Sequence, residues 1–146
     1  MGGGSDGEME RGAAVAGGVK RGGNLKSERE VAENGGMKLP NGKAAIIDMR
    51  KIRYYCLSKE HPRGRHKALV YERVLGMTAQ HSEELRDALK RAAEERDASI
   101  GHSDRYGVRY IIDFELERGD TSAMVRSCWI VRSGETEPRF ITSYVL

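Results

Sequence analysis

The stretch Val108-Arg109-Tyr110-Ile111-Ile112-Asp113-Phe114-Glu115-Leu116 decides the fold class of this chain. Apart from Ile111, its apolar residues stand at every second position, and a period of two is typical of a strand with one buried face. The segments before it have apolar residues with a period near 3.6, which is typical of helices. The sequence therefore predicts that helices give way to strands at about residue 107.

Turn sequences divide the region after this strand. Arg118-Gly119-Asp120-Thr121 is a candidate hairpin turn, and the alternation that follows it predicts a strand from about 123 to 132. Ser133-Gly134-Glu135 begins another turn, before a last strand over residues 139–144. Strands joined by such short turns pair antiparallel, so we expect a meandering antiparallel sheet of three to four strands.

Two to three helices are predicted before the sheet. Asp48 can cap a helix that begins at Met49, and a second helix over residues 66–75 would end at Gly76. Ser82 is a candidate N-cap for a third helix, whose apolar stripe consists of Leu85, Ala88, Leu89, Ala92 and Ala93. Helices followed by an antiparallel sheet indicate an α+β fold.

Residues 1–36 differ in composition from the rest of the chain. They hold 11 of the 18 glycines and no aromatic residue. Such a segment buries too little apolar surface to offset the entropy of ordering, so we expect a disordered tail or linker. It could tether a domain at the end of a longer protein; a wrongly assigned start of the chain is the alternative. Residues 37–146 are then expected to form a single α+β domain.

Composition restricts the class of protein. With 146 residues, 38% hydrophobic residues and a net charge of +3, the chain fits one soluble domain that tolerates an acidic partner. No apolar run approaches the roughly 18 residues that span a membrane, so we expect no membrane partner and a cytoplasmic location. Cys56 and Cys128 show no zinc or redox spacing, and we interpret them as buried free thiols.

A basic loop with two histidines, Lys59-Glu60-His61-Pro62-Arg63-Gly64-Arg65-His66-Lys67, precedes the second predicted helix. Imidazoles exchange protons near neutral pH, so His66 is a candidate catalytic or substrate-contacting residue; a histidine bonded to the backbone at the helix start is the alternative. Arg65 and Lys67 are candidate substrate contacts, unless they form a solvated edge. His61 precedes a proline and could either contact substrate or only shape the turn.

Arginines and hydroxyls on the last two predicted strands form the second candidate region. Arg126 and Arg132 are six residues apart and therefore share one face of a strand, as do Thr142 and Tyr144 on the next. Guanidinium and hydroxyl groups bind phosphate, although a solvated sheet face would have the same composition. Trp129 is either a core residue or a platform on which bases stack.

No metal or nucleotide motif accompanies these residues. The sequence has no HExxH, CxxC, GxGxxG or GxxxxGKS/T pattern, and His61 and His66 are five residues apart across a loop. We therefore expect neither a metal nor a cofactor. Cleavage of a phosphodiester without a metal needs a proton acceptor, a proton donor and cations, all of which the two candidate regions contain.

Motifs distributed over residues 38–145 can be compared with known families. They are Leu39-Pro40-Asn41-Gly42-Lys43-Ala44, His61-Pro62-x-Gly64-x-His66-Lys67-Ala68, Val74-Leu75-Gly76, Arg126-Ser127-x-Trp129-Ile130-Val131-Arg132 and Arg139-Phe140-Ile141-Thr142-Ser143-Tyr144. Together they resemble a family of small bacterial domains of unknown function, some of which lie at the C-termini of polymorphic toxins. More distantly, two helices with a basic His/Lys loop before a sheet that ends in Thr-x-Tyr are similar to the barnase, EndoU, colicin and RelE group of metal-independent ribonucleases.

The resemblance implies an endoribonuclease toxin that cleaves RNA by attack of the ribose 2′-hydroxyl on its own phosphate. On this basis His66 would be the general acid or base. Lys67 and Arg126 would stabilise the phosphorane, and Thr142 and Tyr144 would position the phosphate. The implied partners are RNA and an acidic antitoxin or immunity protein. One alternative is a non-catalytic module that binds nucleic acid or protein through the same surface. An antitoxin or immunity protein is another alternative, against which the mildly basic core argues.

Overall fold

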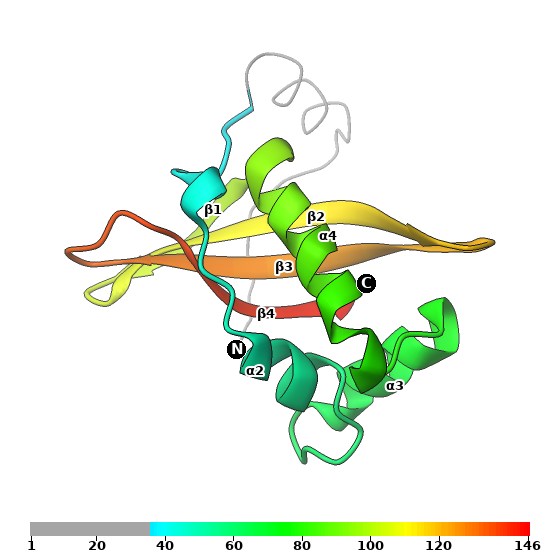
Figure 1. Cartoon of the computed structure of the whole chain (residues 1–146). Helices are drawn as coiled ribbons and strands as arrows, with labels where there is room; N and C mark the ends of the chain where they lie inside the picture. The colour runs from blue at the N-terminus through cyan, green and yellow to red at the C-terminus, as the bar shows by residue number, and fades with distance from the viewer. Residues whose placement is uncertain (1–35) are drawn as a thin grey trace. The chain divides into compact units, whose positions relative to one another are not determined.

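Four antiparallel strands in the order β1-β2-β3-β4 form the sheet, and the helices precede it in the chain (Figure 1). The structure is a computed structural model and describes residues 36–146. The predicted tail over residues 1–36 lies outside this range, apart from Gly36. The α+β prediction, with two to three helices before a sheet of three to four strands, is confirmed.

The two long strands β2 (Gly107–Arg118) and β3 (Thr121–Arg132) form the predicted hairpin. Only Gly119 and Asp120 lie between them, and Gly119 has a φ of 61°, a left-handed conformation that glycine adopts without steric cost. The residues pair without interruption along the whole length of both strands. This two-residue turn therefore fixes which residues face each other throughout the hairpin.

The sequence does not predict strand β1 (Ser99–Asp104), which pairs with β2 at the edge of the sheet. Its register is irregular between Ile100 and Ser103. All of its residues are exposed except Gly101, which has no side chain. A strand that buries neither face shows no apolar alternation, and periodicity therefore cannot reveal it.

A β-bulge in β4 (Arg139–Val145) places side chains on different faces of the sheet. β4 pairs with β3, and the register shifts by one residue at Ile141. Strict alternation would put Phe140, Thr142 and Tyr144 on one face. The bulge instead leaves Phe140 in the core, 1% exposed, and turns Thr142 and Tyr144 to the opposite face.

The helical part begins with three short elements. They are η1 (Gly42–Ala44), α2 (Met49–Lys51) and the π-helical turn η2 (Ile52–Cys56), which follows α2 directly. The Asp48 carboxylate accepts a hydrogen bond from the backbone N–H of Arg50 at 2.9 Å. This bond satisfies a donor that the helix start leaves unpaired, and it confirms Asp48 as the N-cap.

Helix α3 (Arg65–Leu75) ends where the sequence predicts. Gly76 has a φ of 67°, and its N–H donates to the carbonyl of Glu72 at 2.8 Å. Glycine in this left-handed conformation commonly closes a helix. The predicted stop at Gly76 is confirmed.

Helix α4 (Ser82–Glu95) buries the predicted stripe, but its predicted start is wrong. The 3-10 turn η3 (Ala79–His81) leads directly into it, so Ser82 is already helical. The Ser82 hydroxyl donates back to the carbonyl of Ala79 at 2.6 Å and does not cap the helix. A local side-chain bond of this kind competes with the capping that the sequence suggests.

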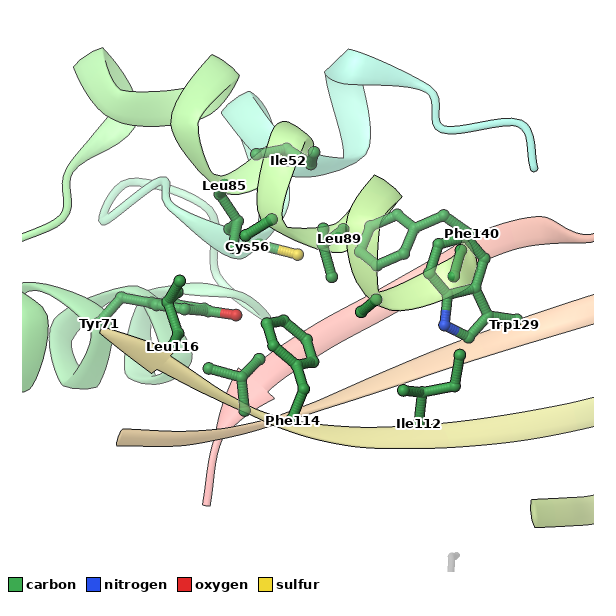
Figure 2. Packing of buried hydrophobic residues seen from close by; sticks show 14 of the residues in the cluster. Ile52, Cys56, Tyr71, Leu85, Leu89, Ile112, Phe114, Leu116, Trp129 and Phe140 are labelled. Atoms are coloured by element: carbon green, nitrogen blue, oxygen red, sulfur yellow. The ribbon is translucent and has the colours of Figure 1, made fainter. Parts of the chain in front are cut away.

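The core lies between the helices and one face of the sheet (Figure 2). Trp129 is fully buried in it, and its indole N–H donates to Ser127 Oγ at 2.9 Å. The Trp129 ring meets the Phe140 ring edge-on, with 5.5 Å between the ring centroids. Aromatic pairs favour this arrangement because the positive edge of one ring meets the negative face of the other.

Arg118 connects the tip of the hairpin to two helices. Its guanidinium donates to the carbonyls of Leu75 and Gly76 at the end of α3, at 3.0 and 3.2 Å, and to the Glu84 carboxylate on α4 at 2.8 Å. A cation at a helix C-terminus stabilises the carbonyls that lack partners there. We expect Arg118→Ala to lower the free energy of unfolding in urea by about 1–3 kcal/mol.

Arg86→Ala is the matched control for Arg118→Ala. Arg86 makes an exposed ion pair with its neighbour Asp87, so its removal should change the free energy of unfolding by less than about 0.5 kcal/mol. Equal effects of the two substitutions would contradict the role given to Arg118.

Candidate functional site

Side chains from three elements meet beside the β3–β4 pair. Lys67, in the first turn of α3, places its ammonium 4.8 Å from the centroid of the Tyr144 ring, within the range of a cation–π interaction. On the sheet, Tyr144 of β4 directly faces Arg126 of β3. We call Lys67, Arg126, Tyr144 and the nearby Thr142 the cationic cluster.

Asp113 fixes the orientation of Arg126. Across the hairpin its carboxylate accepts hydrogen bonds from Nε and Nη2 of Arg126, at 2.8 and 2.9 Å. This paired bond raises the pKa of Arg126 further above its ordinary value, and the Tyr144 hydroxyl contributes in the same direction. A guanidinium has five N–H donors, so Arg126 can hold Asp113 and still donate to an anion.

Thr142 of β4 and Cys128 of β3 face each other two residues further along the same pair of strands. Thr142 Oγ1 also lies 3.9 Å from Sγ of Cys56, which belongs to η2. Because Thr142 and Tyr144 are two residues apart on one face of a strand, their Cα atoms are separated by about 7 Å. Both hydroxyls can therefore approach one phosphate group.

Burial sets the protonation states in this region. It raises the pKa of the Tyr144 hydroxyl, the Cys128 thiol raises it further, and the Arg126 guanidinium opposes both. Burial also raises the pKa of the Cys128 thiol, to about 11. Tyr144 is therefore a hydrogen-bond donor at neutral pH. Two cations and two hydroxyl donors on one surface suit the charge and the acceptor oxygens of a phosphodiester.

The basic loop places its two histidines in different surroundings. The His61 ring lies 4.1 Å from the Tyr55 ring, measured between centroids, and its Nδ1 accepts a hydrogen bond from the Arg63 backbone N–H at 3.1 Å. These contacts support the alternative that His61 shapes the turn. His66 and Arg65 are exposed in the first turn of α3, directly before Lys67, so the His66 ring is accessible to a ligand.

Arg132 and Trp129 lie apart from the cationic cluster. Arg132 shares the sheet face of Arg126 but is six residues further along β3, a distance of about 20 Å. Trp129 points to the other face and is fully buried, so it presents no ring on which a base could stack. Of the two interpretations of Trp129, the structure supports the core residue.

Residues 36–146 contain no group of three or more His, Cys, Asp or Glu side chains arranged to hold a metal ion. None of the helices in this part of the chain is both long and apolar enough to cross a membrane. Cys56 is buried, Cys128 is half-buried, and both are free thiols.

Asp113 is not singled out by the sequence reasoning, although a signal for it exists. Once Gly119 and Asp120 form the turn of an uninterrupted hairpin, Arg126 must face Asp113. Opposite charges at facing positions stabilise a strand pair. The turn sequence and the strand lengths together therefore suffice to find this pair.

Ionisation of the Cys128 thiol should make the chain less stable at high pH. Its pKa is about 11 in the folded chain, against 9.0 for an unperturbed thiol, so the unfolded chain ionises first. The stability associated with the neutral thiol is fully present below about pH 9 and is lost between about pH 9 and 11. We expect the unfolding free energy to fall by about 2 kcal/mol over this range relative to Cys128→Ala.

The comparison with Cys128→Ala removes the titration of tyrosines and lysines, which both chains share. Urea denaturation at several pH values between 8 and 11 measures the difference. If this difference is independent of pH, the pKa of Cys128 is not raised in the folded chain.

A family model described as "Domain of unknown function (DUF6883)" matches residues 38–146. The chain belongs to this family. The DUF6883 match includes every helix and strand described above and all residues of the cationic cluster. Among curated proteins, no significant match to the chain was found.

A solved structure has a similar fold to this DUF6883 domain. It is one chain of a "contact-dependent growth inhibition toxin - immunity protein complex" from Klebsiella pneumoniae 342. The TM-score is 0.52, the sequence identity is 18%, and the similarity covers 69% of this chain and 99% of that chain. At this identity the similarity shows a shared fold.

Proposed function

We propose that this DUF6883 domain is a toxin that cleaves RNA as a metal-independent endoribonuclease. The observation that carries the proposal is the meeting of Lys67, Arg126, Thr142 and Tyr144 on one surface, although they come from three elements. The exposed His66 directly precedes Lys67 in α3. The cluster supplies groups that bind a phosphodiester, and His66 is an exposed imidazole that precedes it in the sequence.

The proposed reaction begins with attack of the ribose 2′-hydroxyl oxygen on the adjacent phosphorus. The bond from phosphorus to the 5′-oxygen of the next nucleotide breaks, which leaves a 2′,3′-cyclic phosphate and a 5′-hydroxyl. One proton leaves the 2′-oxygen and one is added to the 5′-oxygen, and His66 carries one of these transfers. Lys67 and Arg126 stabilise the charge that develops on the phosphorane oxygens, while Thr142 and Tyr144 donate hydrogen bonds to them.

The similar fold in a toxin–immunity complex supports a toxin with a protein inhibitor. Either chain of such a complex can share a fold with this one, and the charge favours the toxin. An inhibitor of a nucleic-acid enzyme gains affinity from acidic groups that replace the phosphates. Arg63, Arg65 and His66 are exposed beside Lys67, so an acidic partner could cover the basic loop and the cationic cluster together.

The proposal is tested by incubation of the purified chain with tRNA, ribosome-bound mRNA and total RNA in the presence of EDTA. We expect fragments that end in a cyclic phosphate and begin with a 5′-hydroxyl. The same protein expressed in bacterial cytoplasm should arrest growth. Intact RNA at protein concentrations that arrest growth would contradict the proposal.

A module that binds nucleic acid or protein without catalysis is the second candidate. The pairing of Arg126 with Asp113 favours this candidate. The paired guanidinium is held in place for recognition, while the Asp113 carboxylate offsets part of the positive charge that would stabilise a phosphorane. Such a module would bind RNA with an affinity that falls steeply with salt, and it would release no product.

A further inference from the structure

A chain of polar side chains runs through the core behind the cationic cluster. The Tyr71 hydroxyl lies 2.7 Å from Ser143 Oγ, and Ser143 Oγ donates to Cys56 Sγ at 3.6 Å. Cys56 Sγ in turn lies 3.9 Å from Thr142 Oγ1. Tyr71, Ser143 and Cys56 are each at most 1% exposed, and Figure 2 shows the Tyr71 oxygen and the Cys56 sulfur among apolar side chains. This series of polar side chains leaves the core at Thr142, a member of the cationic cluster.

The donors in this chain can be assigned in order. Ser143 uses its single hydroxyl proton toward Cys56, so the contact between Tyr71 and Ser143 needs the proton of Tyr71. Burial raises the pKa of Tyr71, which keeps this proton in place. Among the described residues, the thiol proton of Cys56 then has Thr142 Oγ1 as its remaining acceptor. Within residues 36–146, the hydroxyl proton of Thr142 then has no acceptor of its own.

Cys56 can contact both faces of the sheet because β4 is an edge strand. Thr142 and Ser143 are consecutive residues, so their side chains point to opposite faces. A single sulfur atom can approach both only from beside the strand, and η2 provides Cys56 at that place. The bulge at Ile141 increases the local twist directly before these residues.

We propose that Cys56 is a positioning residue, which donates to Thr142 Oγ1 and so directs the Thr142 hydroxyl proton toward a phosphate oxygen of the RNA substrate. The inference rests on the proposed function, which gives Thr142 its role. Cys56 is buried and acts through Thr142, without contact to the substrate.

A double-mutant cycle of RNA cleavage tests this role. Cys56→Ala should lower kcat about fivefold, the effect of one neutral hydrogen bond, and should change KM by less than about twofold. Cys56→Ser should cleave RNA with a kcat close to that of the unaltered protein, because a hydroxyl also donates a hydrogen bond. In the Thr142→Val background, Cys56→Ala should cause no further loss. Equal losses in both backgrounds would overturn the proposal, since Cys56 would then act through packing.

The infrared S–H stretching band tests the same hydrogen bond without RNA. In the Cys128→Ala background one thiol is left, and its band should lie at the frequency of a hydrogen-bonded thiol. Thr142→Val should move the band to the frequency of a free thiol. A band that does not move overturns the proposal, whatever the kinetics show. If the band moves but the protein cleaves no RNA, the result supports the Cys56–Thr142 bond and contradicts the proposed function.

Discussion

The His66→Ala variant is expected to cleave RNA at least a hundredfold more slowly than the unaltered chain, since general acid–base catalysis contributes about 10²–10⁴-fold. Because His66 is exposed in the first turn of α3, the substitution should leave the thermal unfolding midpoint unchanged. Initial rates on a short RNA in EDTA, together with circular dichroism melting, measure both quantities.

A substrate with an activated leaving group separates the two possible roles of His66. Uridine 3′-(p-nitrophenyl phosphate) releases p-nitrophenolate, which needs no general acid. If His66 is the acid, His66→Ala should cleave this ester nearly as fast as the unaltered chain; if it is the base, the loss should persist. Added imidazole should restore part of the rate, because the site of the missing ring is open to solvent.

His102→Ala is the matched control for His66→Ala. The His102 side chain is 71% exposed on β1 and lies close to Asp104, outside the cationic cluster. Its removal should leave the rate of RNA cleavage unchanged. Cleavage by His66→Ala at the rate of the His102→Ala variant would remove His66 from the mechanism.

The second large effect is expected from Arg126→Ala, which should lower kcat by about 10²–10³-fold with a smaller change in KM. The reason is that Arg126 would act on charge that appears only as the phosphorane forms. Arg126→Lys keeps the charge but loses the paired hydrogen bonds to Asp113, so it should show an intermediate rate. Arg91→Ala, at an exposed position of α4, serves as the control.

The same variant also tests the binding module. If the domain only binds RNA, Arg126→Ala should weaken binding and lower the slope of log affinity against log salt by about one phosphate contact. Neither the unaltered protein nor Arg126→Ala should then form a cleavage product. Unchanged cleavage and unchanged salt dependence would exclude Arg126 from the RNA-contacting surface altogether.

The elements that the sequence predicts correctly are those with one continuous buried face. The period of two in β2 and the stripe of α4 both arise from such faces. β1 escapes prediction because it is exposed, and the start of α4 is misplaced because η3 supplies a turn before Ser82. Local propensity thus fails where a neighbouring element changes the role of a residue.

The candidate site is predictable to a smaller extent. Residue chemistry alone points to Lys67, Arg126, Thr142 and Tyr144, whereas their binding of a substrate stays a prediction. The contact of Cys56 with Thr142 depends on where η2 lies beside the edge of the sheet, which no spacing in the sequence expresses.

On the proposed function, the bulge at Ile141 places the core residue of β4 and the residues that contact RNA on opposite faces. Residues that serve a binding site often cost stability, and stabilising substitutions often reduce activity. In β4 the core residue Phe140 and the cluster residues Thr142 and Tyr144 point to opposite faces. Substitutions at Tyr144 can therefore be tolerated without repacking the core around Phe140. On the proposed function, the RNA contact of Tyr144 can therefore change while the core around Phe140 is kept.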